Sequence, residues 1–167
     1  MLTTQNAQSI RFAVNNVRPT GLGAGGMRAI KLKDDMDMVI GAAVAVDGLS
    51  SWVCTDTGVA KLTGLDEYPV QGRGGQGVIS LKLPKDAVGI AAATLGHPDD
   101  KIVLVTSGGR PKYMRMSLAP VMKRAARGDY IISLRDGEAV TRVVPLEPRI
   151  ELPDGDLVDE ESEVAEE

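Results

Sequence analysis

Two glycine-rich loops beside basic side chains are the features of this sequence best suited to chemistry. The first loop contains Gln71, Arg73 and Gln76, and the equivalent loop 51 residues later contains Lys123, Arg124 and Arg127. The glycines of the first loop are Gly72, Gly74, Gly75 and Gly77. Backbone N–H groups left accessible by glycine, with Arg or Lys beside them, suit phosphate oxygens. We therefore predict that these loops hold phosphate groups without reading bases.

Residues 21–26 and 72–77 both fit the G-x-G-x-x-G pattern of dinucleotide-binding proteins. In those proteins the glycine run follows a strand and opens a helix. Here the runs lead into residues 27–32 and 78–83, whose alternating hydrophobicity predicts strands. The pattern therefore indicates loops between strands, where glycine permits positive φ or close backbone approach.

Other residues with chemical potential lack the companions that a site needs. His97 is the single histidine, so we expect it in a loop and not in a metal site. Cys54 cannot form an internal disulfide, and with Trp52 it lies on a strand that we predict to be buried. Residues 35–37 resemble a metal-binding acidic pair, but their recurrent position predicts a solvated turn. We predict no catalytic site and no cofactor, because no nucleophile, base and oxyanion donor occur together.

The elements that must position these loops follow from a repeat of 51 residues that occurs three times. Its anchors are Thr4, Thr55 and Thr106, then Gly26, Gly77 and Gly128, then Leu32, Leu83 and Leu134. In the second and third repeats, two apolar or alternating runs flank a glycine-containing turn, which predicts a β-hairpin. These hairpin strands are expected over 51–55 and 59–62, and over 102–106 and 112–115.

Two further strands are expected in each repeat. The third strands are predicted at 27–32, 78–83 and 130–134, and the fourth strands at 38–44, 88–93 and 139–144. Four strands in about 50 residues is the size of a propeller blade, and a single blade cannot bury both of its faces. The sequence thus predicts an all-β, propeller-like domain over 1–150. Its three stacked four-stranded blades would span about 1–50, 51–101 and 102–150.

Charge divides the chain into two unlike parts. The net charge is −4, but residues 151–167 contain nine acidic residues and no basic ones, which leaves residues 1–150 at +5. A basic body favours a polyanionic partner, and an acidic, proline- and glycine-punctuated tail is typical of disorder. We predict a disordered tail that competes with the partner. No apolar run is long enough to span a membrane, so no membrane partner is expected.

The segment Glu67-Tyr68-Pro69-Val70-Gln71-Gly72-Arg73-Gly74-Gly75-Gln76-Gly77-Val78-Ile79 resembles the box motif found in blades of DNA gyrase A. Residues 17–21 and 26–32 look like another blade of the same family, and the resemblance covers roughly residues 1–146. The family box has the form Gln-Arg-Arg-Gly-Gly-Lys-Gly. Gly72 replaces its first Arg and Gln76 replaces its Lys.

The resemblance implies a β-pinwheel whose blades exchange strands, and whose basic rim binds, bends and wraps double-stranded DNA. Three blades would form half of a disc that usually has about six. The chain itself would be non-catalytic, within an ATP-dependent type II topoisomerase, an isomerase of the bacterial cytoplasm and nucleoid. Its partners would be the rest of gyrase A, the gyrase B protein, and a second copy that completes the disc. The predicted DNA-contacting set is Gln71, Arg73, Gln76, Arg110, Lys112, Arg115, Lys123, Arg124 and Arg127.

Alternatives stay open at this point. Gyrase and topoisomerase IV are not distinguished by the sequence. A protein-interaction propeller, or a self-assembling half-propeller without nucleic-acid affinity, would instead use an apolar patch or an open blade edge. A stand-alone enzyme is the least favoured reading.

Overall fold

The computed structural model describes residues 1–146, and these form eleven strands and three short 3-10 helices. The predicted tail over 151–167 lies outside the described residues, as does the end of the predicted domain at 147–150. The strands are β1 (Leu2–Thr4), β2 (Gln8–Ile10), β3 (Val39–Ala42), β4 (Ser50–Thr55), β5 (Val59–Gly64), β6 (Val78–Ile79), β7 (Ile90–Gly96), β8 (Lys101–Thr106), β9 (Pro111–Arg115), β10 (Asp129–Tyr130) and β11 (Val140–Pro145). The 3-10 helices are η1 (Val14–Asn16), η2 (Leu65–Glu67) and η3 (Met116–Leu118). The all-β prediction is confirmed.

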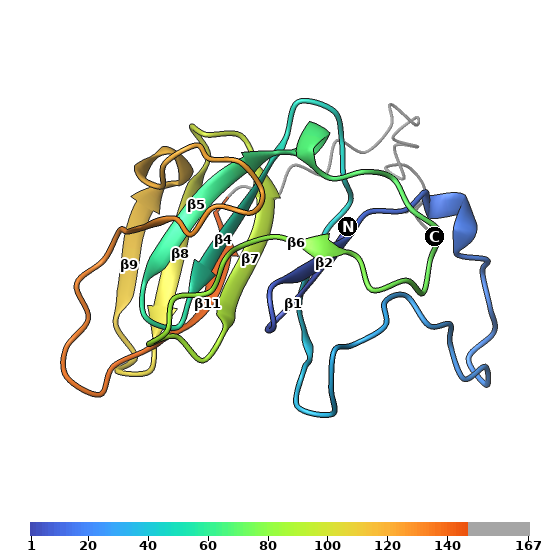
Figure 1. Ribbon diagram of the computed structural model, residues 1–167, viewed down its shortest axis with the longest axis horizontal. Helices are drawn as coiled ribbons and strands as arrows, with labels where there is room; N and C mark the ends of the chain where they lie inside the picture. Colours follow the sequence, from blue (N-terminus) through green and yellow to red (C-terminus); the bar gives the residue numbers. More distant parts are fainter. Residues whose placement is uncertain (147–167) are drawn as a thin grey trace, which may run out of the picture.

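The strands form three antiparallel sheets that stand side by side (Figure 1). The orders are β3-β1-β2-β6, β10-β5-β4-β7 and β11-β8-β9. The first two sheets each take their last strand from the following repeat. Val78 pairs with Ser9, and Asp129 pairs with Ala60, so the register is the same after a shift of 51 residues. Strand exchange is therefore built into the fold, and the third sheet has three strands with β9 at its edge.

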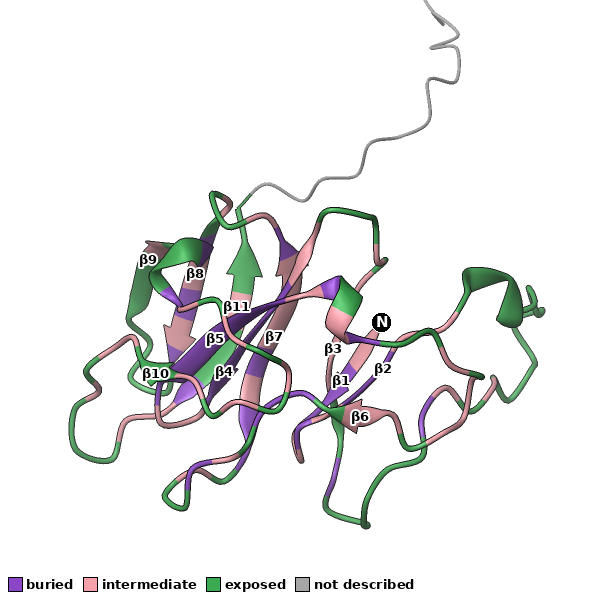
Figure 2. Ribbon diagram, turned by 45° about the horizontal axis from the view of Figure 1, so that its top comes forward, coloured by how far each residue is buried: buried purple, intermediate pink, exposed green. Residues whose placement is uncertain are grey.

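Strands β4 and β5 of the middle sheet are buried over most of their length (Figure 2). The side chains of β4 alternate between two different cores. Trp52 and Cys54 pack with Ile102 and Leu104 of the third repeat, and all four are fully buried. On the other face, Val53 packs in a smaller core with Ala7, Leu81 and Ile90. The packing roles predicted for Trp52 and Cys54 are confirmed, and burial raises the pKa of the Cys54 thiol to about 12.

An acidic side chain fastens the turn before the fourth strand in each repeat. Asp37 accepts hydrogen bonds from the N–H groups of Asn6 (2.9 Å) and Lys33 (3.2 Å). Asp56 likewise accepts the N–H of Val88 at 3.0 Å. The turn predicted at 35–37 is present, but Asp37 is only 5% exposed and holds backbone donors instead of water. Within residues 1–146 no three acidic, His or Cys side chains gather as metal ligands.

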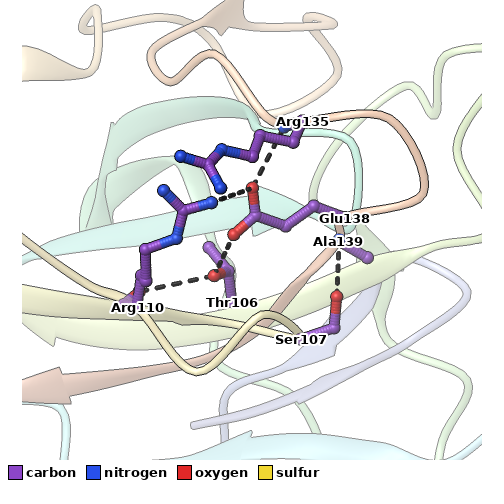
Figure 3. Close-up of polar contacts among 6 residues, drawn as sticks. All are labelled: Thr106, Ser107, Arg110, Arg135, Glu138 and Ala139. Atoms are coloured by element: carbon purple, nitrogen blue, oxygen red, sulfur yellow. Dashed lines mark hydrogen bonds and ion pairs between the residues drawn. The ribbon is translucent and has the colours of Figure 1, made fainter.

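Glu138 plays this part in the third repeat (Figure 3). Its carboxylate accepts hydrogen bonds from the Thr106 hydroxyl and from the Arg135 N–H at 3.0 Å, and it lies 4.0 Å from the Arg110 guanidinium. The Thr106 hydrogen bond, followed by the Arg135 backbone donor, lowers the pKa of Glu138. Asp37, Asp56 and Glu138 occupy different positions of the repeat. Each repeat therefore uses a different acidic residue to accept the backbone N–H groups of this turn.

The third strands are much shorter than predicted. Residues 27–32 form no strand, β6 has two residues, and β10 begins one residue earlier than expected and also has two. After β6 the chain leaves the sheet, and Lys82 N–H binds the Ala126 carbonyl of the next loop at 3.1 Å. Lys31 N–H binds the Gly75 carbonyl at 2.8 Å in the same way. The hydrophobic alternation that predicted longer strands is therefore found in segments that bond to the next glycine loop and not to a strand. The fourth strands lie where predicted, and His97 lies in the loop between β7 and β8.

Candidate nucleic-acid interface

The glycine loops 72–77 and 123–128 lead directly into the exchanged strands β6 and β10, at the edges of the first and second sheets that are remote from β3 and β7 (Figure 2). Gly128 has φ +88° immediately before β10, and Gly77 has φ +74° immediately before β6. A Cβ on Gly128 would lie 2.6 Å from the Ala60 carbonyl oxygen. Only glycine fits, because the backbone must turn with positive φ while it approaches another strand. The close-approach role inferred for these glycines is therefore present in the structure.

Arg73 fastens the repeat-two loop to the first repeat. Its Nε donates to the Asn16 carbonyl at 3.2 Å, its Nη1 donates to the Arg28 carbonyl, and the neighbouring Gly74 N–H binds Ala29 at 2.8 Å. Arg73 is only partly exposed. Two of its donors are thus committed to the protein, although the sequence suggested a phosphate contact.

The two glutamines of this loop differ in exposure. Gln76 is exposed, whereas Gln71 is partly buried and its backbone N–H binds the Arg11 carbonyl at 2.8 Å. Gln76 therefore keeps an accessible side chain for a ligand, and Gln71 joins the loop to the residue that follows β2.

The repeat-three loop carries the most accessible cations. Lys123 and Arg127 are exposed, and neither forms an ion pair within the described part of the chain. Arg124 is only partly exposed, because its Nη1 donates to the Ile79 carbonyl at 2.5 Å. Its buried Nε has no hydrogen-bond partner among residues 1–146. Lys123 and Arg127 are consequently free to meet an external anion, while Arg124 is anchored.

Lys61 was not identified from the sequence, yet it is fully buried beneath this loop. Its ammonium donates to the carbonyls of Lys123 (2.7 Å) and Arg124 (2.5 Å), and Thr63 on the same strand donates to Met122 at 3.0 Å. Burial, with the nearby Arg124 guanidinium, lowers the pKa of Lys61 to about 8, whereas Glu67 opposes this shift. In the sequence, Lys61 alternates with Val59 and Thr63 on one face of a predicted strand. A lysine on a face that is otherwise suited to burial could have identified this residue.

The third group of predicted cations lies on β9 and directly before it. Lys112 is exposed without an ion pair among the described residues, and Arg110 faces Glu138. Arg115 lies 3.7 Å from Asp99, but the two side chains are 61% and 88% exposed, so water screens this pair strongly. In the middle sheet the equivalent strand is covered by β10, whereas β9 is uncovered. Its side chains are therefore accessible.

The model of the family "DNA gyrase C-terminal domain, beta-propeller" matches residues 1–45, 53–94 and 100–147, once for each repeat. The chain belongs to this family. The predicted propeller-like fold and the resemblance to DNA gyrase A are thereby confirmed. Among the described residues, no helix is long and apolar enough to cross a membrane.

The DNA gyrase A protein of Aminobacterium colombiense is 33% identical over 141 residues, which is 84% of this chain and 17% of that protein. The Mycobacterium tuberculosis protein of the same name is 31% identical over 147 residues, again 17% of its length. A solved C-terminal domain of DNA topoisomerase IV aligns with a TM-score of 0.80 at 22% identity, over 87% of this chain and 46% of that domain. The Escherichia coli ParC C-terminal domain aligns with a TM-score of 0.62 at 16% identity, over 87% of this chain and 60% of that domain. These two alignments show that this chain shares the fold of those domains.

Proposed function

We propose that this chain binds and bends double-stranded DNA as the non-catalytic C-terminal module of a bacterial type II topoisomerase, a protein of the gyrase A type. With the rest of gyrase A and with gyrase B, it would support ATP-dependent supercoiling in the cytoplasm, on the nucleoid. The observation that carries the proposal is the placement of exposed cations, without ion pairs among residues 1–146, on the repeat-three glycine loop and on β9. Family membership supports the same conclusion.

The expected mode of binding is electrostatic and independent of sequence. Lys112, Lys123 and Arg127 are the exposed members of the predicted set that form no ion pair within the described residues. Each phosphate contact releases counterions, so the slope of log affinity against log salt is roughly −0.9 per contact. These three side chains together would contribute a slope of roughly −3. Backbone donors of the glycine loops can add contacts that position the duplex.

A gel-shift titration of a linear duplex at several salt concentrations tests the proposal. The triple variant Lys112→Ala, Lys123→Ala, Arg127→Ala should bind at least tenfold more weakly at low salt, with a slope reduced by roughly 2–3. A matched control removes three other exposed cations, Lys33, Lys85 and Arg142, and should change affinity much less. Absence of binding by the native chain at low salt, with the acidic segment 151–167 also removed, would refute the proposal.

The acidic segment 151–167 provides a second test in the same assay. Its nine carboxylates are tethered to a basic body, so they should compete with DNA for the cations. Its deletion should tighten binding at low salt, and the difference should disappear as salt screens both interactions. Equal affinity of the two chains at low salt would contradict this part of the proposal.

Self-association is a second candidate function, favoured by the outer face of the third sheet. Val103, Val105 and Tyr113 are equivalent to Trp52, Cys54 and Leu62, which are fully buried against that sheet. Val103 and Val105 are partly exposed, and Tyr113 is 62% exposed. A second copy that completes the disc would cover this face. Sedimentation at rising protein concentration should then reveal a dimer that Tyr113→Lys abolishes, and a monomer at every concentration would exclude it.

Strand exchange would contribute little to such a dimer. Ile131 N–H binds the Gly58 carbonyl at 3.0 Å, so by antiparallel alternation Ala60 and Asp129 also exchange backbone hydrogen bonds. The residue equivalent to Ala60 on β9 is Pro111, which has no N–H to donate. An edge of this kind resists the addition of a strand. The candidate dimer therefore depends on face-to-face packing.

A further inference from the structure

Lys61 is the buried charged residue of the described chain whose contacts point to a role in the proposed interface. The lysine is fully buried, and its ammonium reaches the carbonyls of Lys123 and Arg124 at 2.7 and 2.5 Å. A buried ammonium is unfavourable unless it is hydrogen-bonded, and replacement by an apolar side chain often preserves stability. Fold stability alone therefore gives little reason for a lysine at this position.

The first repeat illustrates what the fold requires here. Its equivalent residue, Ile10, is buried under the preceding glycine loop, and a Cβ added to Gly75 would lie 3.8 Å from its Cδ1. An apolar side chain is thus sufficient to support a glycine loop at this place. In the second repeat a polar side chain reaches the loop backbone instead. That loop carries the exposed Lys123 and Arg127, whereas the loop over Ile10 carries Arg73, which is bound to protein carbonyls.

The bonds from β5 fix the backbone of the repeat-three loop over several consecutive residues. Leu62 N–H binds Pro120, Met122 N–H binds Leu62, and Thr63 donates to Met122, all within 3.0 Å. Lys61 extends this attachment to residues 123 and 124, where the chain turns outward. Without it, the segment from 123 to 126 keeps the Lys123–Ala126 turn (3.0 Å), the bond between Ala126 and Lys82, and the Arg124 bond to the Ile79 carbonyl of the first sheet. Among the described residues, Lys61 is then the contact that joins residues 123 and 124 to the middle sheet.

We propose that Lys61 is a positioning residue for the repeat-three loop, because its ammonium holds the backbone of the loop whose exposed Lys123 and Arg127 side chains would meet DNA phosphates. This inference rests on the proposed function. Arg124 and Glu67 are the charged groups that act on this ammonium, with opposite effects. An anion bound at the loop would offset the repulsion from Arg124, so binding of DNA should favour the protonated amine.

The test compares Lys61→Met, which keeps the length and removes the donor, with Lys33→Met, which removes an exposed lysine of the first repeat outside the proposed interface. In duplex titrations Lys61→Met should lose roughly five- to tenfold in affinity, and Lys33→Met less than twofold. Native affinity should fall as pH rises from 7 to 9, and Lys61→Met should lack this extra fall. A role in packing alone would change neither the pH profile nor the salt slope. Equal affinity and pH profiles for the native chain and Lys61→Met would overturn the inference.

Hydrogen exchange of the free protein separates this inference from the proposed function. The amide of Ala126, which bonds within the loop to Lys123, should exchange at least tenfold faster in Lys61→Met, while amides of β4 stay unchanged. Unchanged exchange in the loop would overturn the positioning role even if the native chain binds DNA. Failure of the native chain to bind DNA would refute the proposed function, and the exchange data would still decide whether Lys61 holds the loop.

Discussion

Gly128→Ala should destabilise the fold far more than Gly26→Ala, although the two glycines occupy the same position of the repeat. Their φ angles are +88° and +75°, so alanine meets similar backbone strain at both, about 1 kcal/mol. The surroundings differ. A Cβ on Gly128 would lie 2.6 Å from the oxygen and 3.1 Å from the carbon of the Ala60 carbonyl, whereas a Cβ on Gly26 meets nothing within 4 Å.

The difference in free energy of unfolding between the two variants measures how much the pairing of β10 with β5 contributes to stability. Ala60 is fully buried in a central strand and cannot retreat, so β10 must move away and release its pairing with β5. The loss of about two backbone hydrogen bonds, with the packing beside them, adds roughly 2–3 kcal/mol to the strain. We expect about 1 kcal/mol of destabilisation for Gly26→Ala and about 3–4 kcal/mol for Gly128→Ala.

Urea unfolding followed by circular dichroism would measure both free energies of unfolding. In thermal unfolding the two variants should differ by roughly 5–10 °C in Tm. Exchange of the Ile131 amide, which donates to the Gly58 carbonyl, should accelerate in Gly128→Ala and stay native in Gly26→Ala. Equal destabilisation of the two variants, within about 0.5 kcal/mol, would refute the reasoning, because strand exchange would then contribute nothing to stability.

The remaining predictions concern two buried groups and one fastened turn. The pKa of Lys61 is lowered to about 8, below its value in an unfolded chain, so the unfolded state binds more protons between about pH 8 and 10. Stability should therefore rise with pH in this window, by on the order of 2 kcal/mol relative to Lys61→Met, and urea titrations at pH 7.5 and 10 would measure it. A flat difference between the two chains would contradict this sign. Cys54, with its pKa raised to about 12, should react with a thiol reagent at pH 8 only after unfolding, and rapid labelling of the native protein would contradict its burial. Asp37→Ala should lower stability by about 1–3 kcal/mol, because the N–H groups of Asn6 and Lys33 lose their acceptor; the exposed Asp35→Ala serves as control and should change stability by less than about 0.5 kcal/mol. Urea unfolding checks this pair, and equal stabilities would contradict it.

The 51-residue period by itself determined much of the fold. Equivalent residues such as Gly77 and Gly128 adopt the same backbone conformation in each repeat. The repeat therefore located the hairpins, the fourth strands and the glycine turns. Local alternation identified the faces of β4, because side chains on a strand alternate whatever the partner is. The sequence could also indicate that the loops are basic, and this made a polyanion the expected ligand.

Tertiary structure alone decided which of these side chains are available. Arg73 and Lys123 have similar settings in the sequence, but Arg73 is bound to carbonyls of the first repeat while Lys123 is exposed. Lys61 lies in a strand that the sequence predicts, but its contact with the repeat-three loop appears only in the tertiary structure. The sequence predicts a strand over residues 27–32, yet no strand within residues 1–146 pairs with them. Hydrophobic periodicity predicts the local backbone conformation. The exposure of a side chain and the pairing of a strand depend instead on contacts between residues about 50 positions apart.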